Sequence, residues 1–480
     1  MYGMGTIIPK ILNYIILTAY YTRLFQVKQF GVITELYAYV AFLLIILTYG
    51  TETGYFRFAR DGKENAVFSN LIASLLLTSS FFIIIILLLS GRIAEVLQYE
   101  GNEKYIRILA AIIGIDAFCS IPFAKLRKEE KSIKFASLKI VNVLATIGAV
   151  MFFYELTPFL QNNYNLLTKL HTEGDVVYVL YSNLIASSVI LLLLIPEVKF
   201  KRSYFDWKLL KSIISFSFPL LIAGLAGTIN DTLDRALMKH IIENKDEALY
   251  ILGIYGANFR IAMLLYYFIQ MFRYAVEPFY FNYFGNKDEK ETFAGIMRVF
   301  IGVIIVFIMV VLFYLDYIKF FIPPRYHEGT KVIPVVLVAF LFYGIFFNQS
   351  IWYKLTKKTG FAILLTLAGA LVTVIANVFF VKRYSYMAAA FGHLFAYSLM
   401  MILSYFLSRK YYHIDYKLKR ILEYLLVAIA IFGIRYLLLP EIAWIKDIAG
   451  GLLIVAYTFY ILTRESLLIN IKNLYGSKNS

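Results

Sequence analysis

Long apolar stretches alternate with short polar segments along the whole chain. Most stretches approach the length of about 20 residues that an α-helix needs to cross a bilayer. Fourteen can be delimited, near residues 5–22, 36–55, 68–89, 106–123, 136–154, 177–195, 212–233, 254–275, 295–314, 332–352, 361–381, 387–407, 421–439 and 448–463. The first, fourth, seventh and last are weak signals, so twelve or thirteen is also compatible. The pattern predicts an all-α polytopic membrane protein with about 14 transmembrane helices.

Composition supports this interpretation and removes the main alternative. Of 480 residues, 60% are hydrophobic and 16% are charged, whereas soluble proteins average about 25% charged residues. A water-soluble enzyme is therefore excluded, and fourteen crossings leave no room for a large extramembrane domain. The single cysteine, Cys119, excludes an intrachain disulfide.

The net charge of +16 is explained by membrane topology. Cytoplasmic loops collect Lys and Arg, and the loops on the side of the amino terminus carry more of them than the opposite loops. We therefore expect both termini to be cytoplasmic, and we expect no nucleic-acid partner. The densest cluster is expected to lie against anionic lipid head groups. It contains Lys125, Arg127, Lys128, Lys131 and Lys134.

A weak internal repeat divides the chain. Residues 29–58 align without a gap over residues 254–283, with five identities that include Gly31 over Gly256 and Glu52 over Glu277. Two six-helix halves in one orientation place a substrate path between them. We predict an N-terminal lobe at 1–200, a C-terminal lobe at 201–410, and two appended helices at 411–480. Chance similarity between apolar helices is the alternative.

Ten charged residues lie within or at the edges of the predicted spans. An ionised group at mid-bilayer costs about 2.5–3.5 kcal/mol on insertion scales, so each needs water or a partner. Most fall on predicted helices 1, 2, 7 and 8, which predicts a polar central cavity lined by these helices. Alternatively, charged side chains near the ends of the spans extend to the membrane–water interface.

Cations and carboxylates in these positions suggest two roles. Arg forks match phosphate oxygens, so we assign an anionic head group to Lys10, Arg57, Arg235, Arg260 and Arg273. We assign ion coupling or gating to Glu35, Glu52, Asp116, Asp231, Asp234 and Glu277. H⁺ or Na⁺ is the expected coupling ion, and no cofactor or metal is expected.

Repeat positions sharpen two of these assignments. Glu35 aligns with Arg260, and we predict that the two pair when the outer side is closed. Glu52 and Glu277 share the pattern Glu-x-x-Tyr-Phe and could titrate with an ion gradient. Alternatively, each carboxylate holds a cation in place, Arg57 or Arg273.

Enzyme signatures are missing. The sequence has no Gly-x-x-x-x-Gly-Lys-Ser/Thr phosphate loop and no His-Glu-x-x-His metal motif. We therefore expect a secondary transporter and not an enzyme.

Three segments carry a family resemblance: YTRLFQVKQFGVITELYAYVAFLLIILTYGTETGYFRFAR, SIPFAKLRKEEKSIKFASLKI and GTINDTLDRALMKHI. With them the sequence resembles the Wzx-type polysaccharide flippases of the multidrug/oligosaccharidyl-lipid/polysaccharide (MOP) exporter superfamily. The resemblance implies two six-helix lobes and alternating access that moves a lipid-diphosphate-linked oligosaccharide to the outer leaflet. It matches Arg57, Asp234 and Arg235 to cavity positions of the family, together with the Glu52 and Glu277 patterns.

Several expectations follow from the resemblance. The protein would act as a monomer in a bacterial cytoplasmic membrane, with polyprenyl-diphosphate oligosaccharide as substrate and with polysaccharide polymerase and glycosyltransferases as functional partners. A cation-coupled small-molecule exporter of the same fold is the first alternative. A membrane-embedded glycosyltransferase or polymerase is the second, and it is disfavoured because no loop is long enough for its catalytic groups.

Overall fold

The computed structural model describes residues 2–60, 63–164, 166–167, 175–198, 200, 204–438 and 442–465. Within these ranges the chain is helical and has no strand. The helices are α1 (Tyr2–Leu24), α2 (Val27–Thr48), α3 (Thr51–Phe58), α4 (Glu64–Val96), α5 (Glu103–Lys128), α6 (Ser132–Met151), α7 (Thr157–Tyr164), α8 (Val177–Leu194), α9 (Trp207–Ile241), α10 (Lys245–Tyr283), α11 (Glu289–Phe313), α12 (Leu315–Ile318), α13 (Val332–Gln349), α14 (Ile351–Leu355), α15 (Gly360–Tyr384), α16 (Tyr386–Tyr411), α17 (Leu418–Gly433) and α18 (Ala443–Arg464).

The predicted polytopic membrane fold is confirmed. Among the described residues, thirteen helical segments are long and apolar enough to cross a membrane, and each coincides with one of the predicted stretches. The remaining predicted span is α1, a 23-residue helix that carries Pro9 and Lys10 and is not among the thirteen. Many helices extend beyond their apolar stretch, because polar turns continue into the interface. α10, for example, runs over 39 residues.

Contacts divide the chain into two compact units. Unit 1 comprises Met1–Gly256 with Asn377–Lys382, and unit 2 comprises Ala257–Ala376 with Arg383–Ser480. The predicted lobe boundaries at 200 and 410 stay a prediction, as does the central cavity between the lobes.

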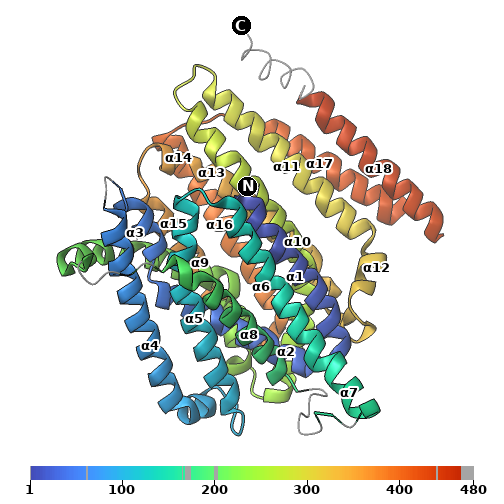
Figure 1. The fold of residues 1–480 in the computed structure, drawn as a ribbon. Helices are drawn as coiled ribbons and strands as arrows, with labels where there is room; N and C mark the ends of the chain where they lie inside the picture. The colour runs from blue at the N-terminus through green and yellow to red at the C-terminus, as the bar shows by residue number, and fades with distance from the viewer. Residues whose placement is uncertain are drawn as a thin grey trace. The chain divides into compact units, whose positions relative to one another are not determined.

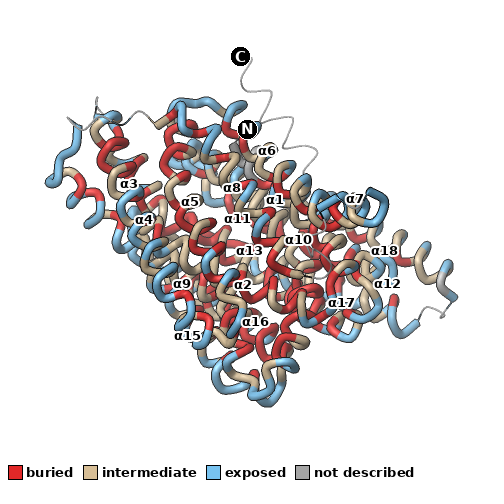
Figure 2. The backbone as a smooth tube through the Cα atoms, turned by 60° about the horizontal axis from the view of Figure 1, so that its bottom comes forward, coloured by how far each residue is buried: buried red, intermediate tan, exposed pale blue. Residues whose placement is uncertain are grey.

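Unit 1 is a bundle in which neighbours in sequence also pack in space. Figure 1 shows α4 and α5 side by side, α1 packs on α6, and α8 contacts both α5 and α6. Exposed leucines on α4, including Leu76, Leu77 and Leu88, face away from the bundle. Figure 2 shows exposed stretches along α4, in contrast to the largely buried α13 of unit 2. Outward apolar side chains are what a lipid-facing helix requires.

α2 and the first part of α10 cross at glycines. A methyl group on Gly31 would overlap the Leu249 carbonyl oxygen, and one on Gly253 would overlap the Val27 carbonyl oxygen. Gly256 meets the Thr34 side chain in the same way. Small residues let helix backbones approach closely in membranes, so this crossing tolerates no larger side chain.

In unit 2, α13 packs along α16, and α17 and α18 run beside α11 (Figure 1). A buried ion pair joins α11 to the end of α18. Arg298 Nε and Nη2 donate to the two Glu465 carboxylate oxygens, each over 2.8 Å, and Tyr424 also donates to this carboxylate. The predicted appended helices, α17 and α18, thus contact α11 through this ion pair as well as through apolar side chains.

We predict that Arg298→Ala lowers stability by about 3–5 kcal/mol, because the buried Glu465 carboxylate loses its two-pronged partner and keeps only the more exposed Arg420, at 3.9 Å, as a cation. Burial raises the pKa of Glu465, but hydrogen bonds from Arg298 and Tyr424 outweigh it and hold this pKa below the ordinary value. The stabilisation is therefore present above the ordinary glutamate pKa and is lost as pH falls through the lowered one.

Thermal melting of the purified protein in detergent at several pH values tests this prediction. The matched control is Arg464→Ala, which removes a more exposed pair that joins α18 to Glu423 of α17. Equal melting of the two variants at neutral pH would contradict the assignment.

Candidate functional site

Two cations and one carboxylate meet at one end of the first span of unit 2. On α10, Arg273 Nε lies 3.5 Å from Glu277 Oε2, and from α14 Lys354 Nζ donates to Glu277 Oε1 over 2.9 Å. Both cations also lie over the Phe347 ring, at 4.2 and 4.8 Å from its centroid. The cluster carries one net positive charge and is half-buried. We call these four residues the unit 2 cluster.

The alternative in which Glu277 holds Arg273 therefore describes this structure. A small pocket beside Glu277 and Lys354 measures about 10 Å³, room for about one water molecule. Asn348, which accepts a hydrogen bond from Tyr280 over 2.6 Å, contributes to its wall. The unit 2 cluster thus leaves no space for a larger anion in this structure. The side chains of the cluster have to move before such an anion can bind.

A second charged group lies in unit 1 on α9. Arg235 Nε is 3.4 Å from the buried Asp234 carboxylate, and Arg235 also donates to the Asp231 carbonyl oxygen. Tyr255, which is fully buried on α10, donates to Asp234. Tyr14 of α1 lies within electrostatic range of Arg235. Sequence analysis singled out all three α9 residues, and the structure gathers them around one guanidinium.

α1 brings Lys10 near a cation that sequence analysis missed. Lys10 is exposed although it lies well inside a helix, and it acts electrostatically on Lys139 of α6, which also senses Asp116 of α5. Lys139 Nζ lies 3.7 Å from the Phe123 ring centroid, and Asp116 lies beside Ser187. The sequence does contain a signal for Lys139, because this lysine lies inside the apolar stretch 136–154. Lys139 closely follows the basic cluster, however, and therefore resembles a loop cation.

The basic cluster between α5 and α6 is paired with carboxylates. Arg127 pairs with Glu52 and lies over the Phe56 ring, so Glu52 holds Arg127 and not Arg57. Lys128 pairs with Glu64 over 2.9 Å. Glu197, which is buried, lies within 4 Å of three lysine ammonium groups. Contact of the cluster with lipid head groups stays a prediction.

Arg57 lies on α3, and Arg260 lies on α10, where it acts electrostatically on Tyr326. Arg57 is exposed and stacks over Phe216 at 4.6 Å. The predicted pairing of Glu35 with Arg260 joins residues of different units and stays a prediction. Within unit 1, Glu35 is buried and its partner is Lys239, at 3.3 Å.

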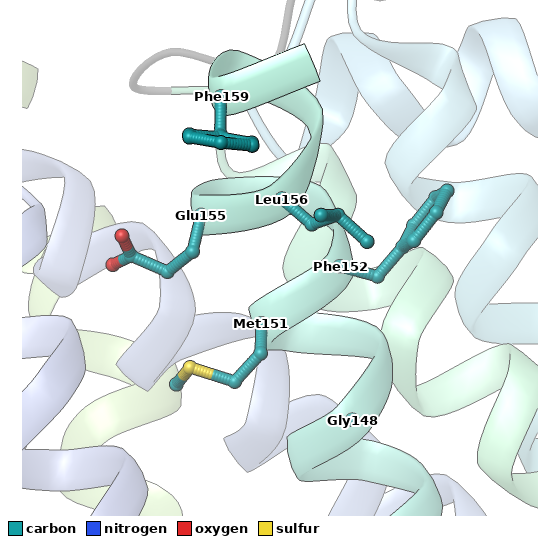
Figure 3. Close-up of a pocket in the computed structure, with 6 residues that line it drawn as sticks. All are labelled: Gly148, Met151, Phe152, Glu155, Leu156 and Phe159. Carbon is teal, nitrogen blue, oxygen red and sulfur yellow. The ribbon is translucent and has the colours of Figure 1, made fainter.

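A second pocket has a different character. It has a volume of about 630 Å³ and lies along α6 and α7. Figure 3 shows its lining, in which Met151 and Glu155 point to one side of the helix and Phe152 to the other. Tyr20 donates to Glu155 over 2.6 Å. None of its six lining residues is a cation, so this groove does not suit an anionic head group. Among the described residues, no cluster of His, Cys, Asp or Glu could hold a metal ion.

Comparisons with known proteins agree with this architecture. Residues 1–284 match the family described as polysaccharide biosynthesis protein. The fold is similar to an inward-facing multidrug resistance MATE family transporter of the MOP superfamily, with 16% identity, a TM-score of 0.62, and coverage of 83% of this chain and 93% of that one. It is also similar to the lipid II flippase MurJ in an inward closed conformation, with 15% identity, a TM-score of 0.65, and coverage of 94% and 99%. No curated protein sequence matches.

Proposed function

The chain belongs to the polysaccharide biosynthesis protein family, and on this premise we propose that it is a flippase for lipid-diphosphate-linked oligosaccharide. The predicted membership of the MOP superfamily is confirmed by this match and by the fold. In the proposed reaction, alternating access carries the substrate from the inner to the outer leaflet of a bacterial cytoplasmic membrane. An ion gradient drives it, and no covalent bond changes.

The unit 2 cluster is the observation that supports this substrate class most strongly. Arg273 and Lys354 share a single carboxylate, so one positive charge remains for an incoming anion. A diphosphate carries two or more negative charges and can accept from both the Arg fork and the ammonium. The partial burial of the cluster strengthens each of these contacts relative to bulk water.

The family's biosynthetic role favours a saccharide cargo, and the largely apolar groove along α6 and α7 suits a lipid carrier. Both termini are proposed to be cytoplasmic, from the charge bias of the loops. Glycosyltransferases would supply the substrate and a polymerase would consume it. We propose that a monomer is the transporting unit.

A small-molecule exporter is the second candidate, because one of the similar folds is that of a multidrug resistance transporter. An organic cation would bind carboxylates and aromatic rings. In unit 2 the carboxylate of Glu277 is already neutralised by two cations, which favours an anionic cargo.

The proposed function predicts a transport defect in Arg273→Ala and in Lys354→Ala. Loss of one charged hydrogen-bonding partner costs about 1.5–3 kcal/mol, so we expect outer-leaflet delivery to fall about tenfold or more. Delivery is measured in proteoliposomes that carry a polyprenyl-diphosphate oligosaccharide, by its accessibility to an added glycosidase. Arg464→Ala, far along the chain on α18, is the control. Normal delivery in both cluster variants would exclude this diphosphate site, and export of an organic cation instead would favour the second candidate.

A further inference from the structure

We propose that Glu35 binds the coupling proton and that His240 and Tyr39 deliver it. This inference names the coupling ion of the flippase and rests on the proposed function for that link only. The proton site itself lies entirely within unit 1 and can be tested without any cargo.

Glu35 is a carboxylate with no exposed surface and a complete set of partners. Tyr99 donates to its Oε2 over 2.7 Å and Tyr39 donates to its Oε1 over 2.9 Å. Lys239 Nζ lies 3.3 Å from Oε2, and neither charged side chain of this pair is exposed. Two hydroxyl donors and one ammonium group thus surround this carboxylate inside the protein.

Tyr39 connects this enclosed carboxylate to the surface. Its hydroxyl oxygen lies 3.0 Å from His240 Nε2, and His240 is exposed at the C-terminal end of α9. Histidine is the side chain that gains and loses a proton near neutral pH. The other phenol on Glu35, that of Tyr99, is buried and leads to no imidazole.

The geometry permits a balanced proton transfer. A proton on His240 Nε2 passes to the Tyr39 oxygen while the Tyr39 hydroxyl proton passes to Glu35 Oε1. The products are a neutral Glu35 carboxylic acid, an intact Tyr39 phenol and a neutral imidazole, which water reprotonates. The reverse transfer empties the site.

Protonation leaves Lys239 without its counter-charge. Lys239 Nζ also donates to the Leu97 carbonyl oxygen over 2.6 Å and lies 3.5 Å from the Tyr99 ring centroid, but neither partner carries a negative charge. An unpaired buried ammonium is strongly unfavourable. The contact of α2 with α9 therefore weakens when Glu35 is neutral, which couples proton binding to helix movement.

The other titratable groups around the site are accounted for. Lys245 and Glu100 pair at 3.8 Å and both act on Lys239, and Tyr105 stacks edge-on against Tyr99. Burial first, and then the charge of Glu35, raises the pKa of Tyr99 well above its usual range. Tyr99 therefore stays a donor at all physiological pH values.

Infrared difference spectroscopy after a pH jump tests the site on the full-length, cargo-free protein in lipid nanodiscs. Acidification should produce the carbonyl stretch of a buried carboxylic acid, and Glu35→Gln should abolish it. If Glu35→Gln does not fold, Glu35→Gln with Lys239→Met removes both charges together and serves instead. A signal that persists without Glu35 would overturn the proposal.

The proposed proton route through His240 and Tyr39 is tested by the rate at which the infrared signal of protonated Glu35 appears. Tyr39→Phe and His240→Asn should each slow it by about 100-fold, the lower range for a positioned proton-transfer group. Tyr105→Phe is the matched control, because it removes a phenol hydroxyl beside Tyr99 that belongs neither to the partners of Glu35 nor to the route, and it should leave the rate within a fewfold of the original. Unchanged rates in both route variants would overturn the delivery path. Loss of transport with a normal infrared signal would count against the proposed function and not against the proton site.

Discussion

Replacing Gly31 with alanine will destabilise the protein by about 3 kcal/mol or more and will deplete the folded form in the membrane. The added methyl group overlaps the Leu249 carbonyl oxygen, which belongs to a helix backbone and cannot rotate away. Overpacking in a core costs about 1–3 kcal/mol when side chains can yield, and here the whole α10 helix has to shift. Gly253→Ala will have a similar effect, through the Val27 carbonyl oxygen.

Melting temperature and the yield of monodisperse protein measure this loss. Gly148→Ala is the matched control, because a methyl group there meets nothing within 4 Å. The double variant will be less damaging than the sum of the two single variants, since both act on one crossing. If the Gly31→Ala and Gly148→Ala variants have the same melting temperature, then α2 and α10 do not cross at Gly31.

Replacing both Lys10 and Lys139 with alanine will reduce outer-leaflet delivery by about 100-fold or more. Two charged contacts to the head group are lost together, at about 1.5–3 kcal/mol each. Lys139 acts electrostatically with Lys10 and Asp116 inside unit 1, and its removal alone will already reduce delivery.

Lys134→Ala is the control for this pair, since it lies on the same helix but pairs with Glu197 over 2.5 Å. The same proteoliposome assay provides the measurement. Full delivery by the double variant would remove Lys10 and Lys139 from head-group binding.

The pattern of apolar stretches predicts this fold well because the lipid environment restricts which backbone structures can cross a membrane. A backbone in lipid has to satisfy its hydrogen bonds within the protein, and an apolar stretch of about 20 residues does this as an α-helix. Each apolar stretch found in the sequence is therefore a helix in the structure. Helix ends were less predictable. α9, for example, starts at Trp207, where Asp206 caps it by accepting from Lys208 and Leu209, several residues before the apolar stretch begins.

Charge partners were predictable only within a single helix. Glu277 and Arg273 are four residues apart on α10, so their pairing could be inferred from spacing. Glu52 and Arg127, or Glu35 and Lys239, are brought together by packing between helices that are distant in the sequence. Lys239 was missed because it ends a span, where a cation usually reaches the interface. The structure instead encloses it completely.

One irregular turn affects how this chain can vary. Residues Phe152–Leu156 form a π-helical turn between α6 and α7, and Thr157 donates its hydroxyl to the Phe152 carbonyl oxygen over 2.8 Å. Such a turn holds one residue more than an α-helical turn, and one residue corresponds to about 100° of rotation. Loss of one residue within this turn would convert it into an α-helical turn and leave Phe159 and the rest of α7 facing nearly the same side of the helix (Figure 3), whereas the same loss within α6 would rotate them by about 100°. The π-helical turn thus marks a place where the chain can lose a residue without reorienting this groove.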